Sequence, residues 1–195
     1  HSQALEAWYT HIPGLVVVGP STPADNHALL SAAIRCDDPV VYMEHKNLWP
    51  VEGEVDEDAA PAPLGKAAVR RTGGDITIVS WSACVREAEG AADLLGEAGI
   101  AAEVIDLRTL WPWDRDCVLA SAHRTGRLLV AHEAVGVGGF GAEVAATVAE
   151  LAGVPVARVA APRAPIAYAP TMEGVVKVTA AKIAARAREL VEQRR

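Results

Sequence analysis

Residues 127–151 read RLLVAHEAVGVGGFGAEVAATVAEL, an apolar strand pattern followed by a glycine-rich turn and a helical pattern. The run RLLVAHE (127–133) predicts a strand, and GAEVAATVAEL (141–151) predicts a helix. A strand that leads through a short turn into a helix is half of a strand–helix–strand crossover. This stretch therefore predicts an α/β architecture with parallel strands.

The same alternation continues on both sides of this stretch. Strands are expected at DITIVSWS (75–82), AAEVIDL (101–107) and VPVARVA (154–160). Helices are expected over residues 84–98, with Gly99 as the C-terminal cap, and over residues 114–124. Because parallel crossovers place helices on both faces of a sheet, we expect residues from about Leu64 to form a five-stranded, mostly parallel sheet.

Two further elements complete this region. LGKAAVRR (64–71) and DITIVSWS flank Thr72, Gly73 and Gly74, which predicts a hairpin and an antiparallel strand before Gly73. The tail from Thr171 is expected to form one closing amphipathic helix. Its apolar face is made of Val176, Ala180, Ile183, Ala187 and Leu190.

The N-terminal region predicts one smaller strand–helix–strand unit. LVVVG (15–19) and PVVYMEH (39–45) are expected as strands. Between them, Thr22 is a candidate N-cap, with Pro23 at the first helical position and Asp25 at the third. One such unit is too small to be a complete domain.

Residues 49–63, WPVEGEVDEDAAPAP, are acidic and proline-containing and lack any periodicity, as expected of an exposed linker. We therefore expect three parts. Residues 1–49 are part of one domain, residues 50–63 are a linker, and residues 64–195 are a second domain.

The composition excludes several classes of protein. The chain has 195 residues, of which 51% are hydrophobic and 22% charged, and its formal net charge is −7. This balance argues against a disordered chain and against binding to nucleic acid or an anionic membrane. No run of 18 apolar residues is present, so no membrane span is expected. Cys36, Cys84 and Cys117 form no CxxC pair, which favours a reducing, cytoplasmic setting.

The turn GVGGFG (136–141) matches the G-x-G-x-x-G pattern of dinucleotide sites. However, no acidic residue lies about 20 residues further on to bind a ribose, although Arg163 could accept a 2′-phosphate and so favour NADP. We favour the interpretation that the glycines allow a tight strand-to-helix turn. His132 and Glu133 lie where open α/β sheets bind ligands, but neighbours on a strand point to opposite faces and cannot act together, so a packed or surface-exposed His132 is favoured.

Five stretches, read in order, carry a family resemblance. They are HSQALEAWYTHIPGLVVVGPSTPADN (1–26), PVVYMEHKNLWP (39–50), AEVIDLRTLWPWD (102–114), TGRLLVAHEAVGVGGFGAEVAA (125–146) and APRAPIAYAP (161–170). Together the chain resembles the beta subunit of the thiamine-diphosphate-dependent 2-oxo acid dehydrogenases of the pyruvate, branched-chain and acetoin types. The resemblance implies the end of a pyrimidine-binding domain up to about Trp49, followed by a transketolase C-terminal-type domain.

The resemblance also implies a function. The expected reaction is oxidative decarboxylation of a small 2-oxo acid with acyl transfer to a lipoyl acyltransferase core, in an assembly with an alpha subunit and a second beta subunit. The cofactor is thiamine diphosphate with magnesium. In the family, the glutamate that activates the cofactor should lie upstream of His1, and the G-D-G motif is on the alpha subunit, so no cofactor-binding residue is expected here and the chain alone is expected to be inactive. Two alternatives are a noncatalytic assembly module and an NADP-binding domain.

Four residues are matched to family sites. His1 matches the histidine of the family's H-S-Q motif, where an imidazole can donate to the substrate, so His1 is the expected catalytic residue. Ala33, Cys36 and Asp38 match the helix end that holds a structural potassium ion in some members. Cys36 replaces the expected aspartate, although a backbone carbonyl ligand would tolerate this change.

Overall fold

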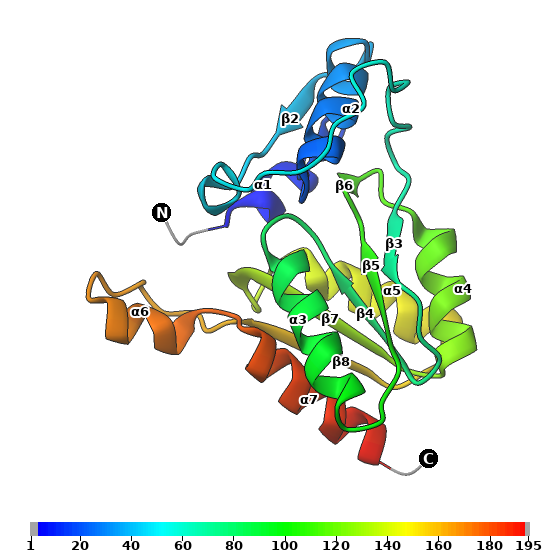
Figure 1. The fold of residues 1–195 in the computed structure, drawn as a ribbon, viewed down its shortest axis with the longest axis vertical. Coiled ribbons are helices and arrows are strands. Elements are labelled where there is room, and N and C mark those ends of the chain that lie inside the picture. Colours follow the sequence, from blue (N-terminus) through cyan, green and yellow to red (C-terminus); the bar gives the residue numbers. More distant parts are fainter. Residues whose placement is uncertain (1–3, 194–195) are drawn as a thin grey trace.

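The computed structural model describes residues 4–193 (Figure 1). Within these residues the larger sheet has five strands, and only the pair β3–β5 is antiparallel. The prediction of a five-stranded, mostly parallel sheet is confirmed, including its antiparallel member. Across the sheet, the strands are β3 Ala68–Arg71, β5 Ala102–Asp106, β4 Ile76–Ser80, β7 Leu128–Val135 and β8 Val156–Ala161.

Helices cover both faces of this sheet. Helices α3 (Cys84–Gly96) and α7 (Ala180–Glu192) pack on one face, and α4 (Arg115–Thr125) and α5 (Gly141–Ala152) pack on the other. The central strand β4 is buried on both faces, because Ile78 belongs to one apolar cluster and Val79 to the other. Strands that are covered on both sides can be apolar throughout, as the sequence pattern requires.

The predicted hairpin between residues 64–71 and 75–82 is wrong. Strand β5 lies between β3 and β4, so β3 pairs with β5 and not with its neighbour in sequence. Gly73 is needed for a different reason from a hairpin turn. A Cβ atom on Gly73 would lie 2.2 Å from the carbonyl carbon of Ala102, so only glycine lets the chain pass β5 at this point.

A second sheet is formed by β1 (Val16–Val18), β2 (Val40–Tyr42) and β6 (Thr109–Trp111). Strands β1 and β2 are parallel and joined by α2 (Pro23–Ile34), as expected. The side chain of Thr22 accepts a hydrogen bond from the amide of Asp25 at 3.1 Å, which confirms the predicted N-cap. Strand β6 and the short helix α1 (Glu6–Thr10) were not expected.

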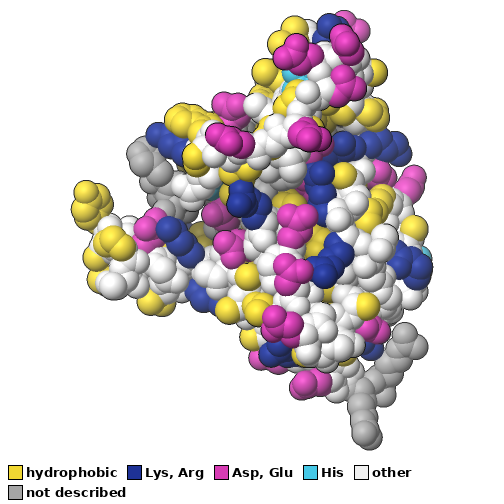
Figure 2. Space-filling view, in the orientation of Figure 1, with side chains coloured by type: hydrophobic (Ala, Val, Ile, Leu, Met, Phe, Trp, Pro, Cys, Tyr) yellow, Lys and Arg dark blue, Asp and Glu magenta, His cyan; other side chains and the backbone are white. Residues whose placement is uncertain are grey.

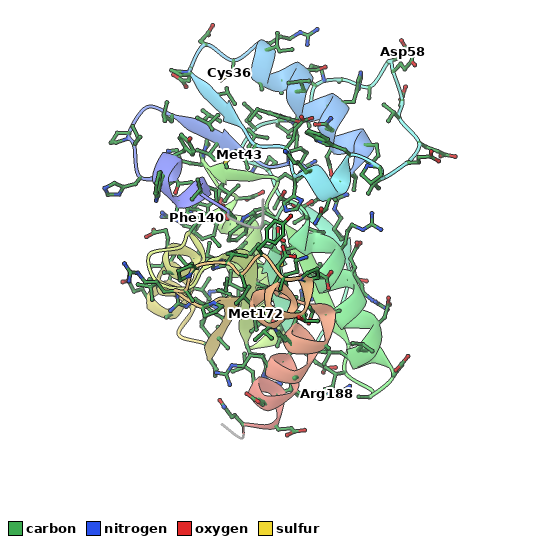
Figure 3. All side chains as sticks on the ribbon, turned by 90° about the vertical axis from the view of Figure 1, so that its left-hand side faces the viewer. Cys36, Met43, Asp58, Phe140, Met172 and Arg188 are labelled. Atoms are coloured by element: carbon green, nitrogen blue, oxygen red, sulfur yellow. The ribbon has the colours of Figure 1, made fainter. Side chains whose placement is uncertain are left out.

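Strand β6 attaches the small sheet to the larger body. It follows β5 in the chain but pairs antiparallel with β1. Residues 49–63 contain no helix or strand and run past α2, where the amide of Ala62 donates to the carbonyl of Ala28 at 3.1 Å. Figure 3 shows Asp58 on this segment, far from Met43 and Phe140, which both belong to the apolar cluster on the α4–α5 face of the larger sheet.

The predicted single closing helix is also wrong. The structure divides it into α6 (Pro170–Val176) and α7, because Lys177 and Thr179 have extended backbone conformations. The Thr179 side chain caps α7, and the amide of Ala180 donates to Glu87 on α3 at 2.7 Å. The contact of Ala180 with α3 therefore marks the start of α7. Helix α6 is a separate short helix, at the left of Figure 1.

Two further observations concern the surface and the cysteines. Over residues 4–193, no helix is long and apolar enough to cross a lipid bilayer. Figure 2 shows acidic and basic side chains interspersed over the face in view. Cys36, Cys84 and Cys117 are unpaired, and burial raises the pKa of the Cys84 thiol to about 12.

Candidate functional site

The strand order places a crevice at the carboxyl ends of β4 and β7. The chain leaves β4 toward β5 on one side, whereas β7 leads to β8 on the other side. Open α/β sheets bind ligands where the direction of winding reverses in this way. A cavity of about 90 Å³ lies here, and we call it the switch-point cavity. Its walls include Glu6, His45, Trp81 and Glu133.

Glu6 is a buried carboxyl group in this cavity. Its side chain comes from α1, only 5% of the residue is exposed, and its Oε1 accepts a hydrogen bond from Trp81 Nε1 at 2.9 Å. Burial raises the pKa of Glu6, and the nearby Glu133 adds to the increase. Titratable groups with shifted pKa values in a crevice are characteristic of functional sites.

His45 and Glu133 form an ion pair across the cavity. Nε2 of His45 lies 3.0 Å from a carboxylate oxygen of Glu133, which is on β7. Nδ1 accepts a hydrogen bond from the amide of Asn47 at 3.1 Å and so caps the 3-10 turn η1 (Lys46–Leu48). The hydrogen bond to Glu133 raises the pKa of His45. The pair therefore joins the end of β2 to the five-stranded sheet.

The glycine turn 136–141 encloses His132. The imidazole is fully buried, and neither ring nitrogen has a hydrogen-bond partner among the described residues. A Cβ atom on Gly141 would lie 2.4 Å from the His132 ring, and one on Gly139 would lie 2.9 Å from it. Burial lowers the pKa of His132 to about 4, so this imidazole is neutral at physiological pH. The glycines thus leave room for a packed histidine beside the strand-to-helix turn.

A larger cavity of about 310 Å³ shares His45 with the first one. It lies between the N-terminal turn of α2, the end of β2 and the start of the linker. Asn26 and Glu44 supply polar groups, and Trp49 supplies an aromatic wall. Glu44 and His45 line both cavities, so the two cavities are neighbours, and we call the larger one the outer cavity.

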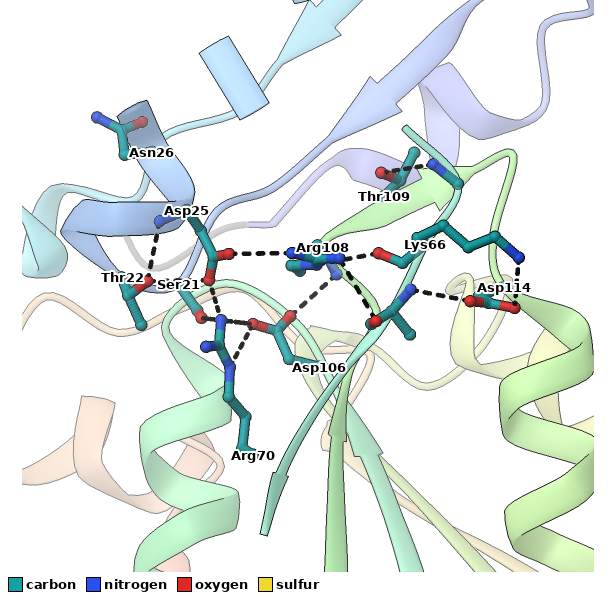
Figure 4. Close-up of polar contacts among 12 residues, drawn as sticks. Ser21, Thr22, Asp25, Asn26, Lys66, Arg70, Asp106, Arg108, Thr109 and Asp114 are labelled. Atoms are coloured by element: carbon teal, nitrogen blue, oxygen red, sulfur yellow. Dashed lines mark hydrogen bonds and ion pairs between the residues drawn. The ribbon is translucent and has the colours of Figure 1, made fainter. Parts of the chain in front are cut away.

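Close to this outer cavity, charged side chains join α2 to the end of β5 (Figure 4). We call Asp25, Arg70, Asp106 and Arg108 the arginine clamp. The Arg70 guanidinium donates to Asp106 at 2.8 Å and also to Asp25. Arg108 donates to Asp25 at 3.3 Å, and Asp106 is completely buried. Each buried carboxylate thus has a guanidinium partner, as buried charges require.

The site residues expected from the sequence have different outcomes. His1 lies outside the described residues. Ala33 and Cys36 lie together at the end of α2, where the Cys36 amide donates to the Ala33 carbonyl at 3.3 Å, and Asp38 is exposed nearby. In the described part of the chain, no group of three His, Cys, Asp or Glu residues is arranged to hold a metal ion. The potassium site, which relies on a carbonyl ligand, stays a prediction.

Comparison with known families identifies the larger region. Residues 65–183 match the transketolase C-terminal domain, and residues 1–52 match the transketolase pyrimidine-binding domain. The first match alone spans more than half of the chain. The chain belongs to the transketolase C-terminal domain family.

Relatives of this transketolase-family chain are beta subunits. It is 45% identical to the beta subunit of acetoin:2,6-dichlorophenolindophenol oxidoreductase of Cupriavidus necator, with 98% of this chain and 58% of that protein covered. It is 42% identical to the 2-oxoisovalerate dehydrogenase subunit beta of Bacillus subtilis, with 98% and 61% covered. The resemblance stated from the sequence is confirmed. The chain spans about three fifths of the length of these relatives.

A solved structure shares the fold. A protein described as "Split gene transketolase, inactive beta4 tetramer" superposes with a TM-score of 0.86 at 27% identity, and the match covers 97% of this chain and 62% of that one. The expected fold class, with its transketolase-type domains, is therefore confirmed for this transketolase-family chain.

Sequence reasoning missed three of the four groups that meet in the switch-point cavity. Glu6 was not identified from the sequence because helix α1 was not expected. Trp81 lay at the end of an expected strand, and the sequence did not indicate which residue it would contact. His45 was only the last residue of an expected strand. The sequence did offer one signal, which was position. Trp81 directly follows β4, and Glu133 lies near the carboxyl end of the parallel strand β7, at the edge of the sheet where ligands bind.

Proposed function

We propose that this chain is the C-terminal portion of the beta subunit of a thiamine-diphosphate-dependent 2-oxo acid dehydrogenase. The reaction is oxidative decarboxylation of a small 2-oxo acid, with transfer of the acyl group to a lipoyl acyltransferase. The main support is the similarity, over 98% of the chain, to the beta subunits of a 2-oxoisovalerate dehydrogenase and of an acetoin oxidoreductase. The order of the two matched domains gives further support.

The proposal includes a cofactor and partners. Thiamine diphosphate with magnesium supplies the carbanion chemistry that decarboxylation requires. In residues 4–193, no group of three His, Cys, Asp or Glu residues is arranged to hold a metal ion. We therefore assign that role to other segments, with an alpha subunit, a second beta subunit and the acyltransferase core as partners.

The test concerns His1 and uses the assembled enzyme, with the full-length beta chain and its alpha subunit. His1→Ala removes an acid–base group, so we expect turnover with lipoamide to fall by ~10² to 10⁴. Affinity for thiamine diphosphate should barely change. The control is His123→Ala, because His123 is exposed on α4. Equal, small effects of the two substitutions would contradict the assigned role of His1.

We also propose that the end of α2 holds potassium through backbone carbonyl oxygens near Ala33, Cys36 and Asp38. Carbonyl groups in the last turn of a helix lack helical partners, and they carry partial negative charge. Thermal unfolding in potassium and in tetramethylammonium chloride tests this site. Equal melting temperatures in the two salts at equal ionic strength would contradict it.

A second candidate function is subunit assembly without catalysis. Trp8, Val137 and Val175 are each about 70% exposed and border or lie near an apolar groove between α1, the glycine turn and α6. Figure 2 shows apolar side chains on helix α6 at the left edge. Exposed patches of this kind mark protein interfaces.

Ligand titrations of melting temperature separate these functions. A shift by thiamine diphosphate only in the presence of the alpha subunit supports the dehydrogenase. Self-association with no ligand effect supports an assembly module, and a shift by NADP alone supports dinucleotide binding at the glycine turn. The unpaired cysteines are also consistent with the cytoplasmic location that we propose.

A further inference from the structure

The glycine turn, His132, Trp81 and Glu6 form one continuous series of contacts that ends in the switch-point cavity. We propose that Glu6 is the proton-holding residue of this cavity and donates its carboxylic O–H to an oxygen atom of a small carbonyl ligand. We further propose that the glycine turn positions Glu6 through His132 and Trp81. This role goes beyond the proposed function, because it assigns chemistry to groups that the family resemblance does not mention.

The first contact is between the turn and His132. Gly139 and Gly141 leave no space for a Cβ atom beside the imidazole, so the ring fills the space against the start of α5. The ring is fully buried. Because side chains in a close-packed interior cannot shift freely, the turn fixes the plane of this imidazole.

The second contact transmits that orientation to Trp81. The Trp81 ring stacks on His132 with centroids 5.1 Å apart and planes 12° from parallel, and Phe140 of the turn meets Trp81 edge-on at 5.9 Å. These are the favoured geometries for aromatic pairs. The indole is thereby held with its single N–H donor directed at Glu6 Oε1, at 2.9 Å.

The third step is the charge balance in the cavity. The titratable groups that line the cavity with Glu6 are Glu44 and His45, which follow β2, and Glu133, which is on β7. Of these, Glu133 raises the pKa of Glu6 and His45 lowers it. His45 pairs with Glu133 at 3.0 Å, whereas Glu6 accepts its hydrogen bond from the neutral indole of Trp81. Glu6 is also the more buried of the two carboxyl groups. Burial favours the protonated form of a carboxyl group and raises the pKa of Glu6. We therefore assign the proton to Glu6.

This arrangement allows one hydrogen bond to the ligand. The O–H of Glu6 donates to the ligand oxygen, and the proton stays bonded to Glu6. Oε1 of the same carboxyl group accepts the hydrogen bond from Trp81 Nε1. Carboxyl groups that apolar surroundings keep neutral donate hydrogen bonds in this way.

The experiment follows the indole N–H of Trp81 by NMR in the ¹⁵N-labelled 195-residue chain. The chain has five tryptophans, so the Trp81 resonance is assigned by its loss in Trp81→Phe. In the wild-type chain, this resonance should titrate with an inflection above the ordinary range of glutamate. Glu6→Gln, which keeps an oxygen acceptor for the indole, should abolish that inflection. Glu97→Gln, at an exposed position after α3, should leave it unchanged.

A second variant tests the sharing of charge. His45→Gln removes a group that lowers the pKa of Glu6, so the inflection should move to higher pH. An inflection in the ordinary glutamate range, or one that survives in Glu6→Gln, would overturn the proposal. An inflection that moves down in His45→Gln would do the same. These measurements need no cofactor, partner or substrate, so their failure is distinct from failure of the proposed function.

Discussion

The arginine clamp and the His45–Glu133 pair both join residues that precede the linker to the five-stranded sheet, but they differ in chemistry. The clamp pairs guanidinium groups with Asp25 and with the fully buried Asp106. Guanidinium groups stay protonated at every physiological pH. The side chains of His45 and Glu133 are 20% and 30% exposed, and histidine changes charge near neutrality.

The two junctions therefore differ in their expected roles, attachment of the small sheet for the clamp and pH-dependent charge for the His45–Glu133 pair. The clamp joins the small sheet to the larger one through guanidinium groups, which keep their charge at every physiological pH. The other junction contains the imidazole of His45, whose pKa is raised by its hydrogen bond to Glu133, and it lies beside Glu6, whose pKa is raised by burial. We expect the clamp to hold the two sheets together while His45 changes charge.

The largest expected effect is on the clamp. Arg70→Ala leaves Asp106 buried without its guanidinium partner, so we expect the free energy of unfolding to fall by about 3–5 kcal/mol. Urea denaturation measures this change. The control is Arg71→Ala, because Arg71 pairs with Asp93 on the surface, and we expect a loss of ~1 kcal/mol or less. Similar losses for the two neighbours would show that the clamp does not hold the sheets together.

The next effect is on the packing of His132 against the glycine turn. Gly141→Ala inserts a methyl group 2.4 Å from the His132 ring, and such overpacking costs about 1–3 kcal/mol. Within the same turn, a Cβ on Gly136 would meet Ala160 at an ordinary 3.4 Å, so Gly136→Ala is the matched control. Urea denaturation should show the loss for Gly141→Ala only. Equal stability of the two variants would remove the packing explanation of the glycine motif.

The fold could be predicted where the signal was local. The alternation of strands and helices and the Thr22 cap follow from neighbours in sequence, and both are confirmed. The two wrong predictions, the hairpin and the single closing helix, concern the order of strands in the sheet and the packing of the last helix on α3. The position of β5 between β3 and β4 and the start of α7 at Thr179 depend on contacts with distant residues, which periodicity does not encode.

The site was less predictable for the same reason. The sequence correctly placed His132 and Glu133 at the edge of the sheet where the carboxyl ends of the strands lie. Neighbouring side chains on a strand point in opposite directions, which explains why His132 is packed in the interior and Glu133 contacts His45. Glu6 was not predictable, because a solitary glutamate near the start of the chain is normally exposed. Its burial results from contact with Trp81, which is distant in sequence.

The smallest expected effect is the pH dependence of the His45–Glu133 pair. Because Glu133 raises the pKa of His45 in the folded chain above its ordinary value of 6.5, the pair stabilises the fold fully below that value. The contribution is lost as pH rises through the folded-state pKa. We expect the free energy of unfolding of wild type to exceed that of His45→Gln by ~1 kcal/mol or less, with the difference declining toward alkaline pH. In a Glu133→Gln background the same comparison should not vary with pH over this range, because the partner that raises the pKa is gone. A difference in the free energy of unfolding that grows as pH rises would contradict this expectation. It would show that His45 stabilises the fold as the neutral imidazole, through the hydrogen bond that Nδ1 accepts from the amide of Asn47, and not through its ion pair with Glu133.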